Sequence, residues 1–277
     1  MPAFVPPRSI AAALTLLGST LLIGATRAER PSNAGVETAP VPIAAIVTSV
    51  FPVMAKTPDP IDEAAEEAVE VLSVHVKRAS HPAALRTAFE AYHSYRAEHP
   101  DLVRKPYLYY VDLGLDNRTA RGYVFDMERL TLVDGPFNVA HGTGSSRERN
   151  AVPTRFSNRA GSNASSLGLY LAQETYTFRG KAGGRAYTSV GLRMRGESGS
   201  FNGAARPRGV VAHGAPYVTA REAGRSQGCP AMEQHRAKRL LPMLADGGVV
   251  FVYSPRDEAW LAGDPWIRRE GGKAGTT

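Results

Sequence analysis

The sequence has one cysteine, no long apolar run and no cluster of like charges. Cys229 is the single cysteine among 277 residues, so no internal disulfide can hold the fold. The longest apolar stretch, residues 10–23, is shorter than the roughly 20 residues that a membrane-spanning helix needs. Lys and Arg number 33 against 26 acidic residues, but they are scattered, and no phosphate-binding loop or paired zinc-finger spacing occurs. We therefore expect neither a disulfide-rich nor a membrane-spanning protein, and no nucleic acid as partner.

The chain does carry enough apolar sequence for a globular body, preceded by an export signal. Hydrophobic residues make up 43% of the chain and charged residues 21%, which is typical of a protein with a full core. Arg8 precedes the apolar stretch and Ala28 follows it, so residues 1–28 are predicted to be a signal peptide, with a buried N-terminal helix as the alternative. Residues 29–60, rich in Pro, Ala, Ser and Thr, predict a tether.

Two amphipathic helices are predicted in residues 61–104. The first follows Asp59 as a cap, and the second follows Ser80 as a cap and ends before Pro100. Their apolar residues recur at helical spacing: Ile61, Ala65, Ala68, Leu72 and Val76 in the first helix, and Leu85, Ala88, Phe89, Tyr92 and Tyr95 in the second. We expect both apolar stripes to pack against the domain that follows, with binding of a partner as the alternative.

Residues 105–255 have a mainly β pattern. Short runs typical of strands occupy residues 107–113, 121–125, 137–141, 167–171, 191–194, 209–213 and 248–253. This density of strands predicts an antiparallel sandwich or barrel, within an α+β fold class of mainly β structure. One helix is expected to begin at Cys229 and to end at Leu241 or Leu244. Residues 256–277 are predicted to be a flexible tail.

The surroundings of Cys229 predict a reactive thiol. Pro230 is favoured at the first position of a helix, so the sulfur would lie at the positive end of a helix dipole, which lowers a thiol pKa. Arg225 would lower that pKa further. Gly228 allows a tight turn whose backbone N–H groups could stabilise an oxyanion. A buried core cysteine is the alternative, and the polar residues 224–228 disfavour it.

His213 is the candidate base for this thiol. It ends a predicted strand and precedes Gly214, so the end of that strand and the start of the helix could meet. A backbone carbonyl in the Gly214 turn could orient the imidazole. A zinc site built from His141, His213 and Cys229 is an alternative use of these side chains, but it lacks close ligand spacing. We expect no metal and no cofactor.

Five segments occur along the chain in a recognisable order. They are VAHG at residues 139–142, FSN at 156–158, SSLGLY at 165–170, VAHGAPYV at 211–218 and GRSQGCPA at 224–231. Together they resemble the murein L,D-transpeptidase catalytic-domain family, which has a YkuD-like fold. The resemblance extends over about residues 105–255.

The resemblance implies an exported cysteine acyltransferase in the periplasm or cell envelope of a bacterium. On this reading, Cys229 is the nucleophile that forms a thioester with a peptidoglycan stem peptide, His213 is the general base, and Gly228 lies in the oxyanion turn. Transfer to an amine would make a 3-3 cross-link, whereas transfer to water would make the protein an L,D-carboxypeptidase. A non-catalytic wall-binding protein is a further alternative.

The chain departs from the better-known branch of the family next to the thiol. That branch has Ser-His-Gly-Cys followed two residues later by Arg, whereas this chain has SQGCPA at residues 226–231. Arg225 or Arg208 could replace the missing arginine as a carboxylate anchor. The other candidates for substrate contact are Ser226, His141, Tyr170 and Asn202.

Overall fold

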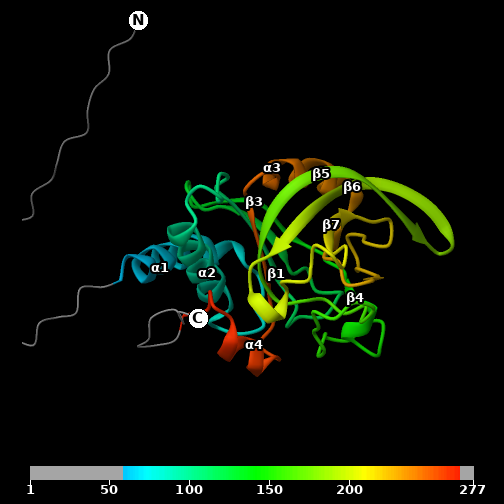
Figure 1. Cartoon of the computed structure of the whole chain (residues 1–277), viewed down its shortest axis with the longest axis horizontal. Coiled ribbons are helices and arrows are strands. Elements are labelled where there is room, and N and C mark those ends of the chain that lie inside the picture. The colour runs from blue at the N-terminus through cyan, green and yellow to red at the C-terminus, as the bar shows by residue number, and fades with distance from the viewer. Residues whose placement is uncertain (1–58, 269–277) are drawn as a thin grey trace, which may run out of the picture. The chain divides into compact units, whose positions relative to one another are not determined.

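A computed structural model describes residues 59–268 and arranges them around one large β-sheet (Figure 1). The predicted signal peptide, the tether up to residue 58 and residues 269–277 lie outside the described residues. The large sheet has eight strands in the order β3-β2-β1-β10-β5-β6-β7-β9. With a few helices around this sheet, the predicted fold class, mainly β and α+β, is confirmed.

The strands of the large sheet are mostly antiparallel to their neighbours. They are β1 (Tyr107–Asp112), β2 (Gly122–Asp126), β3 (Thr131–Phe137), β5 (Gly168–Ala182), β6 (Arg185–Gly196), β7 (Val211–Gly214), β9 (Ala231–Met232) and β10 (Val249–Tyr253). Two pairs, β1 with β10 and β7 with β9, are parallel. Parallel neighbours need a crossover connection, which the long stretches of chain between these strands supply. A separate parallel pair joins β4 (His141–Gly142) to β8 (Arg225–Ser226).

The predicted N-terminal helices are present as α1 (Pro60–Leu72) and α2 (Ala84–Glu98). The Asp59 carboxylate accepts the Ile61 N–H at 2.9 Å, as a cap should. Ser80 was expected to cap the second helix, but its N–H and hydroxyl donate to the buried Asp112 carboxylate at 2.7 and 2.6 Å. Because these hydrogen bonds hold Ser80 at the end of β1, α2 begins only at Ala84.

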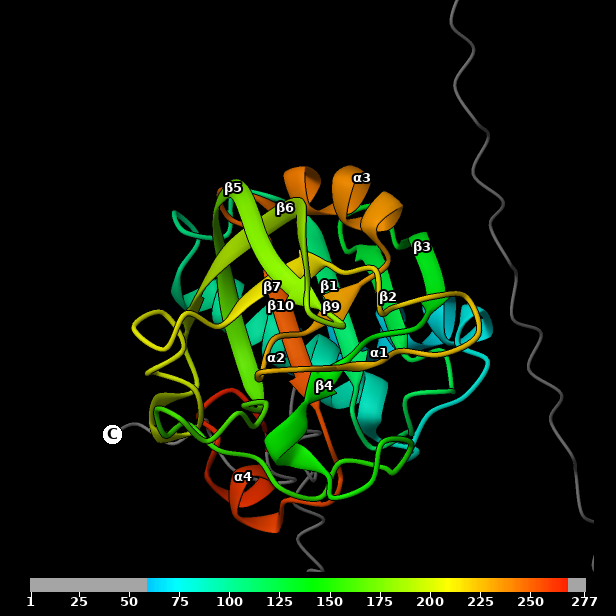
Figure 2. The ribbon, with the colours of Figure 1, turned by 90° about the vertical axis from the view of Figure 1, so that its right-hand side faces the viewer.

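Both helices pack on the sheet, as their apolar stripes predict. The buried residues of α1 and α2 belong to the same hydrophobic core as those of β1, β2 and β10. The ring of Phe89 in α2 meets the ring of Phe125 in β2 edge-on, with centroids 5.6 Å apart. Figure 2 shows both helices behind the sheet. Among residues 59–268, no helix has the length and apolar character to cross a membrane.

Strands β5 and β6 form a hairpin much longer than the predicted runs at 167–171 and 191–194. Gly183 and Gly184 have φ of +55° and +77°, which makes the tight two-residue turn that glycine permits. Outside the central sheet the hairpin alternates between outward polar residues and half-buried aromatic ones, so its middle lacks the apolar run that marks a buried strand. The hairpin curves past β7 (Figure 1).

The helix after the thiol begins later than predicted. Helix α3 spans Gln234–Leu244, so the expectation that it begins at Cys229 is wrong. Ala231 instead pairs with His213 of β7, and its carbonyl accepts the Ala140 N–H at 2.8 Å. These sheet bonds hold the chain extended after Cys229, and the helix can begin only beyond them.

Residues 256–268 were predicted to belong to a flexible tail, but they are folded. Helix α4 (Glu258–Gly263) places Trp260 in the core at 0% exposure, and its indole N–H donates to Asp264 at 2.6 Å. The indole N–H of Trp266 donates to the Glu197 carbonyl at 2.7 Å. Burial of two indoles outweighs the polar composition around them.

Candidate active site

Cys229 follows a glycine that no other residue could replace without strain. Gly228 has φ of +118°, a conformation that side chains disfavour. A Cβ atom there would lie 2.9 Å from the Ala164 carbonyl oxygen. The tight turn predicted at this glycine is therefore present, and it is packed against the segment that contains Ala164.

The hydroxyl of Ser226 holds this turn from within. It accepts the Gly228 N–H at 3.2 Å and donates to the Cys229 carbonyl at 2.7 Å. The predicted oxyanion hole included the Gly228 N–H, but that donor is occupied by Ser226. The Cys229 N–H has no hydrogen-bond partner among the described residues. Ser226, predicted to contact substrate, is buried and shapes the turn.

Ser165 ties the turn to β4. Its hydroxyl accepts the Gly142 N–H at 3.0 Å and donates to the Gly228 carbonyl at 3.1 Å. The space between the two glycines is so small that a Cβ on Gly142 would lie 2.8 Å from the Gly228 Cα atom. Sequence analysis missed this role of Ser165, although the residue opens one of the five segments.

His213 is held in one tautomer by its neighbour. Its Nδ1 atom lies 3.0 Å from the Gly214 carbonyl oxygen, so Nδ1 carries the proton and Nε2 is free to accept one. This is the carbonyl that was expected to orient the ring. Gly214 has no room for a side chain, because a Cβ atom would lie 2.3 Å from the Ser189 hydroxyl.

The imidazole of His213 is buried under the long hairpin. Its ring stacks on Phe178 of β5 with centroids 4.0 Å apart and planes 11° apart, and its exposed fraction is 2%. Burial lowers the pKa of His213 to about 4, against a smaller opposite effect of the Gly214 carbonyl. The imidazole is therefore neutral at neutral pH. Nothing in the sequence around Phe178 indicated this contact.

The sheet brings Cys229 and His213 into neighbouring segments. His213 pairs with Ala231 in the β7–β9 register, so Cys229 lies two residues before the partner of His213. The Val211 N–H, on the same strand as His213, acts on the sulfur and lowers its pKa. No hydrogen bond joins the thiol to the imidazole among the described residues, and the thiol approaches the Gly209 carbonyl at 3.9 Å.

Burial raises the pKa of the Cys229 thiol, although the residue is partly exposed. The Val211 N–H and the Arg208 charge oppose this effect and lower the pKa by smaller amounts. The predicted lowering by a helix dipole is absent, because α3 begins only at Gln234. The free site thus holds a neutral thiol and a neutral imidazole on neighbouring segments, not a preformed ion pair.

The two arginines proposed as carboxylate anchors lie in different places. Arg208 is half-buried, and its guanidinium donates to Ser157, Ser162, Ala164 and Ser166 at 2.6–3.1 Å. It holds that loop while its charge acts on Cys229. Arg225 donates to the Ser146 carbonyl at 3.2 Å and is not among the charges that act on the thiol pKa.

His141 is fully buried and bonded at both ring nitrogens. Its Nδ1 atom lies 2.9 Å from an Arg121 guanidinium nitrogen, and its Nε2 atom lies 2.8 Å from the Ser146 hydroxyl. Burial, with the charges of Arg121 and Arg225, lowers its pKa to about 3. His141 therefore supports the loop after β4 and has no free atom for a substrate.

Tyr170 and Asn202 also point into the protein. The Tyr170 hydroxyl donates to the Ser166 carbonyl at 2.8 Å, and the Asn202 amide donates to the Leu169 carbonyl at 2.8 Å. Both side chains are buried and hold loops near the thiol. Within residues 59–268, no three His, Cys, Asp or Glu side chains come together as metal ligands.

The site combines a glycine turn, a thiol and a neutral imidazole within a mainly β fold. The family model for the L,D-transpeptidase catalytic domain matches residues 77–253. This span is well over half of the chain, so the chain belongs to that family. The match begins before residue 105, and it therefore includes α2.

Solved structures similar to the chain are distant in sequence. An L,D-transpeptidase from Mycobacterium smegmatis has 13% identity and a TM-score of 0.33, over 54% of this chain and 59% of that one. An L,D-transpeptidase from Stackebrandtia nassauensis has 15% identity and a TM-score of 0.34, over 69% of this chain and 78% of that one. This chain thus spans less than two thirds of the first of these proteins. A comparison with curated proteins gives no match.

Proposed function

We propose that the protein is a cysteine acyltransferase that joins peptidoglycan stem peptides through 3-3 cross-links, by way of a thioester on Cys229. The observation that carries the proposal is the single thiol on a strained glycine turn, one strand away from an imidazole with a free acceptor nitrogen. Membership of the L,D-transpeptidase family supports the substrate class. Export to the cell envelope, where this substrate lies, belongs to the same proposal.

The first half of the reaction needs a base because the resting thiol is neutral. Nε2 of His213 accepts the thiol proton as the sulfur attacks the donor peptide carbonyl. The Cys229 N–H, which has no protein partner among the described residues, is the donor available for the negative oxygen that forms. When the C–N bond breaks, the imidazolium returns its proton to the departing amine of the terminal residue, and a thioester remains on the sulfur.

The second half repeats these steps with an acceptor amine. The neutral imidazole accepts a proton as the amine attacks the thioester carbonyl, the C–S bond breaks, and the sulfur recovers a proton from the imidazolium. The new amide bond is the cross-link. Stacking of Phe178 on His213 keeps water away from one face of the imidazole, which favours transfer to an amine over hydrolysis.

The test of the proposal uses a stem tetrapeptide and mass spectrometry of the intact protein. Because Cys229 is the only cysteine, a thioester adduct has a single possible sulfur. We expect the adduct on the native chain, a cross-linked dimer when an acceptor peptide is added, and neither product with Cys229→Ala. Circular dichroism serves as the control for folding of the variant.

Two results would contradict the proposal. A Cys229→Ala protein that forms the same products would exclude the thiol mechanism. Exclusive release of a tripeptide, with no dimer at any acceptor concentration, would assign the same site to a carboxypeptidase.

A further inference from the structure

A cavity lies at the tip of the β5–β6 hairpin. It has a volume of about 370 Å³. Its walls come from the loop after β4 with Thr143 and Arg149, from the hairpin tip with Lys181, and from the segments that contain Tyr217 and Arg225. We call it the tip pocket. None of its residues was predicted to bind substrate except Arg225.

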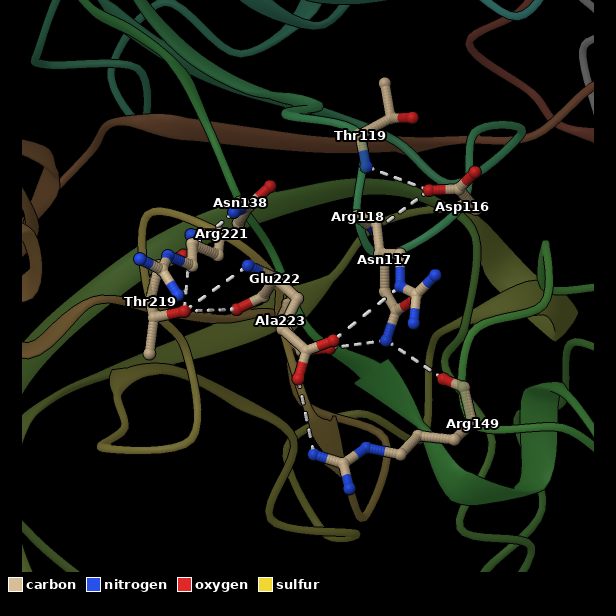
Figure 3. Close-up of polar contacts among 10 residues, drawn as sticks. All are labelled: Asp116, Asn117, Arg118, Thr119, Asn138, Arg149, Thr219, Arg221, Glu222 and Ala223. Carbon is tan, nitrogen blue, oxygen red and sulfur yellow. Dashed lines mark hydrogen bonds and ion pairs between the residues drawn. The ribbon is translucent and has the colours of Figure 1, made fainter.

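The tip pocket carries an excess of positive charge. Arg149, Lys181 and Arg225 line it, and no acidic residue is among its lining residues. Glu222 pairs with Arg149 at 3.5 Å but also with Arg118 at 3.7 Å (Figure 3). Lys181 has no ion pair within residues 59–268, and the hydrogen bonds of the Arg225 guanidinium there go only to backbone carbonyls. Of the three cations, only Arg149 has a carboxylate partner among the described residues, and it shares that carboxylate with Arg118.

Buried polar contacts fix the backbone of Arg149. The Asn117 amide, at 0% exposure, donates to the Arg149 carbonyl at 2.9 Å and also to the Ala223 carbonyl. The Ala223 N–H donates back to the Asn117 carbonyl at 2.8 Å. Figure 3 shows these contacts converging between the two loops. The fold therefore fixes the backbone from which the exposed Arg149 side chain reaches the tip pocket.

The tip pocket approaches the catalytic pair through Tyr217. The Tyr217 ring, in its wall, meets the His213 ring edge-on with centroids 6.5 Å apart. Arg208 is the only arginine whose charge acts on the Cys229 thiol, and it does not line the tip pocket. A ligand group in this cavity would lie near the imidazole that receives the acceptor proton.

We propose that the tip pocket binds the carboxylate of the acyl-acceptor peptide while the amine of that peptide approaches the thioester. This inference rests on the proposed transferase function. An acceptor amino acid with a side-chain amine also carries a carboxylate, and arginine binds carboxylates in a fixed two-point geometry. The pocket would thus select acceptors that end in a free carboxylate and orient their amines toward His213.

The experiment compares two acceptors that share one amine. Nα-acetyl-lysine and Nα-acetyl-lysine amide have the same side-chain amine, and only the first has a carboxylate. We measure KM for each in transfer from a stem tetrapeptide donor. In the Arg149→Gln/Lys181→Gln variant, the preference for the carboxylate acceptor, taken as the ratio of the two KM values, is expected to fall about tenfold, as for the loss of a charge-assisted hydrogen bond.

Arg179→Gln is the matched control. Arg179 is an exposed cation on the same hairpin and is not part of the tip pocket, so this variant should retain the native preference. An unchanged preference in the double variant would overturn the proposal, as would an equal rise of both KM values.

A binding measurement separates this proposal from the proposed function. Cys229→Ala cannot form a thioester, so calorimetric titration of that protein with Nα-acetyl-lysine reports the pocket alone. Binding that weakens about tenfold when Arg149 and Lys181 are also replaced would support the tip pocket even if no thioester forms on the native chain. Equal binding of the acid and its amide would exclude the carboxylate site.

Discussion

At the scale of single residues, the reactivity of Cys229 depends on a turn and not on a helix. The Gly228 backbone has a conformation that only glycine adopts easily, and Ser226 and Ser165 bind its N–H and its carbonyl. The turn leaves the Cys229 N–H without a hydrogen-bond partner among the described residues. The geometry of the backbone thus matters as much as the thiol itself.

Replacement of Gly228 by alanine should test this turn. The added Cβ would press on the Ala164 carbonyl 2.9 Å away, so the turn must shift and acylation should slow by roughly 100-fold, as for a lost oxyanion donor. The measurement is the rate of thioester formation. Gly199→Ala is the control, because Gly199 also has a positive φ but nothing within 4 Å of its Cβ position; equal losses in both variants would refute the argument.

The pH dependence of acylation follows from the lowered pKa of His213. The base must be neutral, and its pKa is about 4 instead of its ordinary 6.5, so activity should be lost on acidification near pH 4 and not near pH 6.5. The raised pKa of the Cys229 thiol means that proton transfer to the base accompanies the attack. An acid limb centred near pH 6.5 in the native protein would show that His213 is not the group that titrates.

At the scale of elements, the β5–β6 hairpin contacts both the base and the tip pocket. Its middle covers His213 with Phe178, and its tip forms one wall of the tip pocket. The hairpin therefore sets the polarity around the base and, by our proposal, the choice of acceptor.

The Phe178→Ala variant should show whether the Phe178 ring lowers the pKa of His213. Removing the ring exposes the imidazole to water, which reduces the desolvation that lowers its pKa, so the acid limb of activity should move up by about one pH unit. The measurement is the pH profile of acylation, with the His213 pKa followed by NMR. Thr177→Ala, on the exposed side of the same strand, should leave the profile unchanged; an unmoved limb in Phe178→Ala would refute the role of the ring.

At the scale of the whole molecule, the C-terminal segment completes the core. Trp260 and Trp266 are buried against residues from α2 and from the strands. Arg268 also reaches Asp62 of α1 at 3.2 Å. Residues 256–268 therefore belong to the folded body together with the N-terminal helices.

Trp260→Ala should lower the free energy of unfolding by about 3–5 kcal/mol, because it leaves a large cavity in the core. Denaturant unfolding, followed by circular dichroism, measures this change. Leu261→Ala is the control, since Leu261 is only partly buried and should cost less than half as much. A Trp260→Ala protein as stable as the native chain would mean that the segment is dispensable after all.

Local sequence patterns were sufficient for the elements that depend on local chemistry. The cap at Asp59 and the apolar stripes of α1 and α2 are read from neighbouring residues, because helix periodicity is a property of short stretches. The start of α3 was mispredicted because Pro230 suits a helix start, whereas the pairing of Ala231 with His213 involves a strand distant in sequence.

The sequence by itself determined the mainly β fold class, the family and the candidate pair of Cys229 and His213, because short segments in a fixed order carry that information. Only the tertiary structure decided the protonation of this pair and the surroundings of the thiol. A pKa depends on burial and on charges that meet in space, and the contacts of Phe178 with His213 and of Ser165 with Gly228 join residues far apart in the chain. Burial in the folded chain therefore leaves both the thiol and the imidazole neutral.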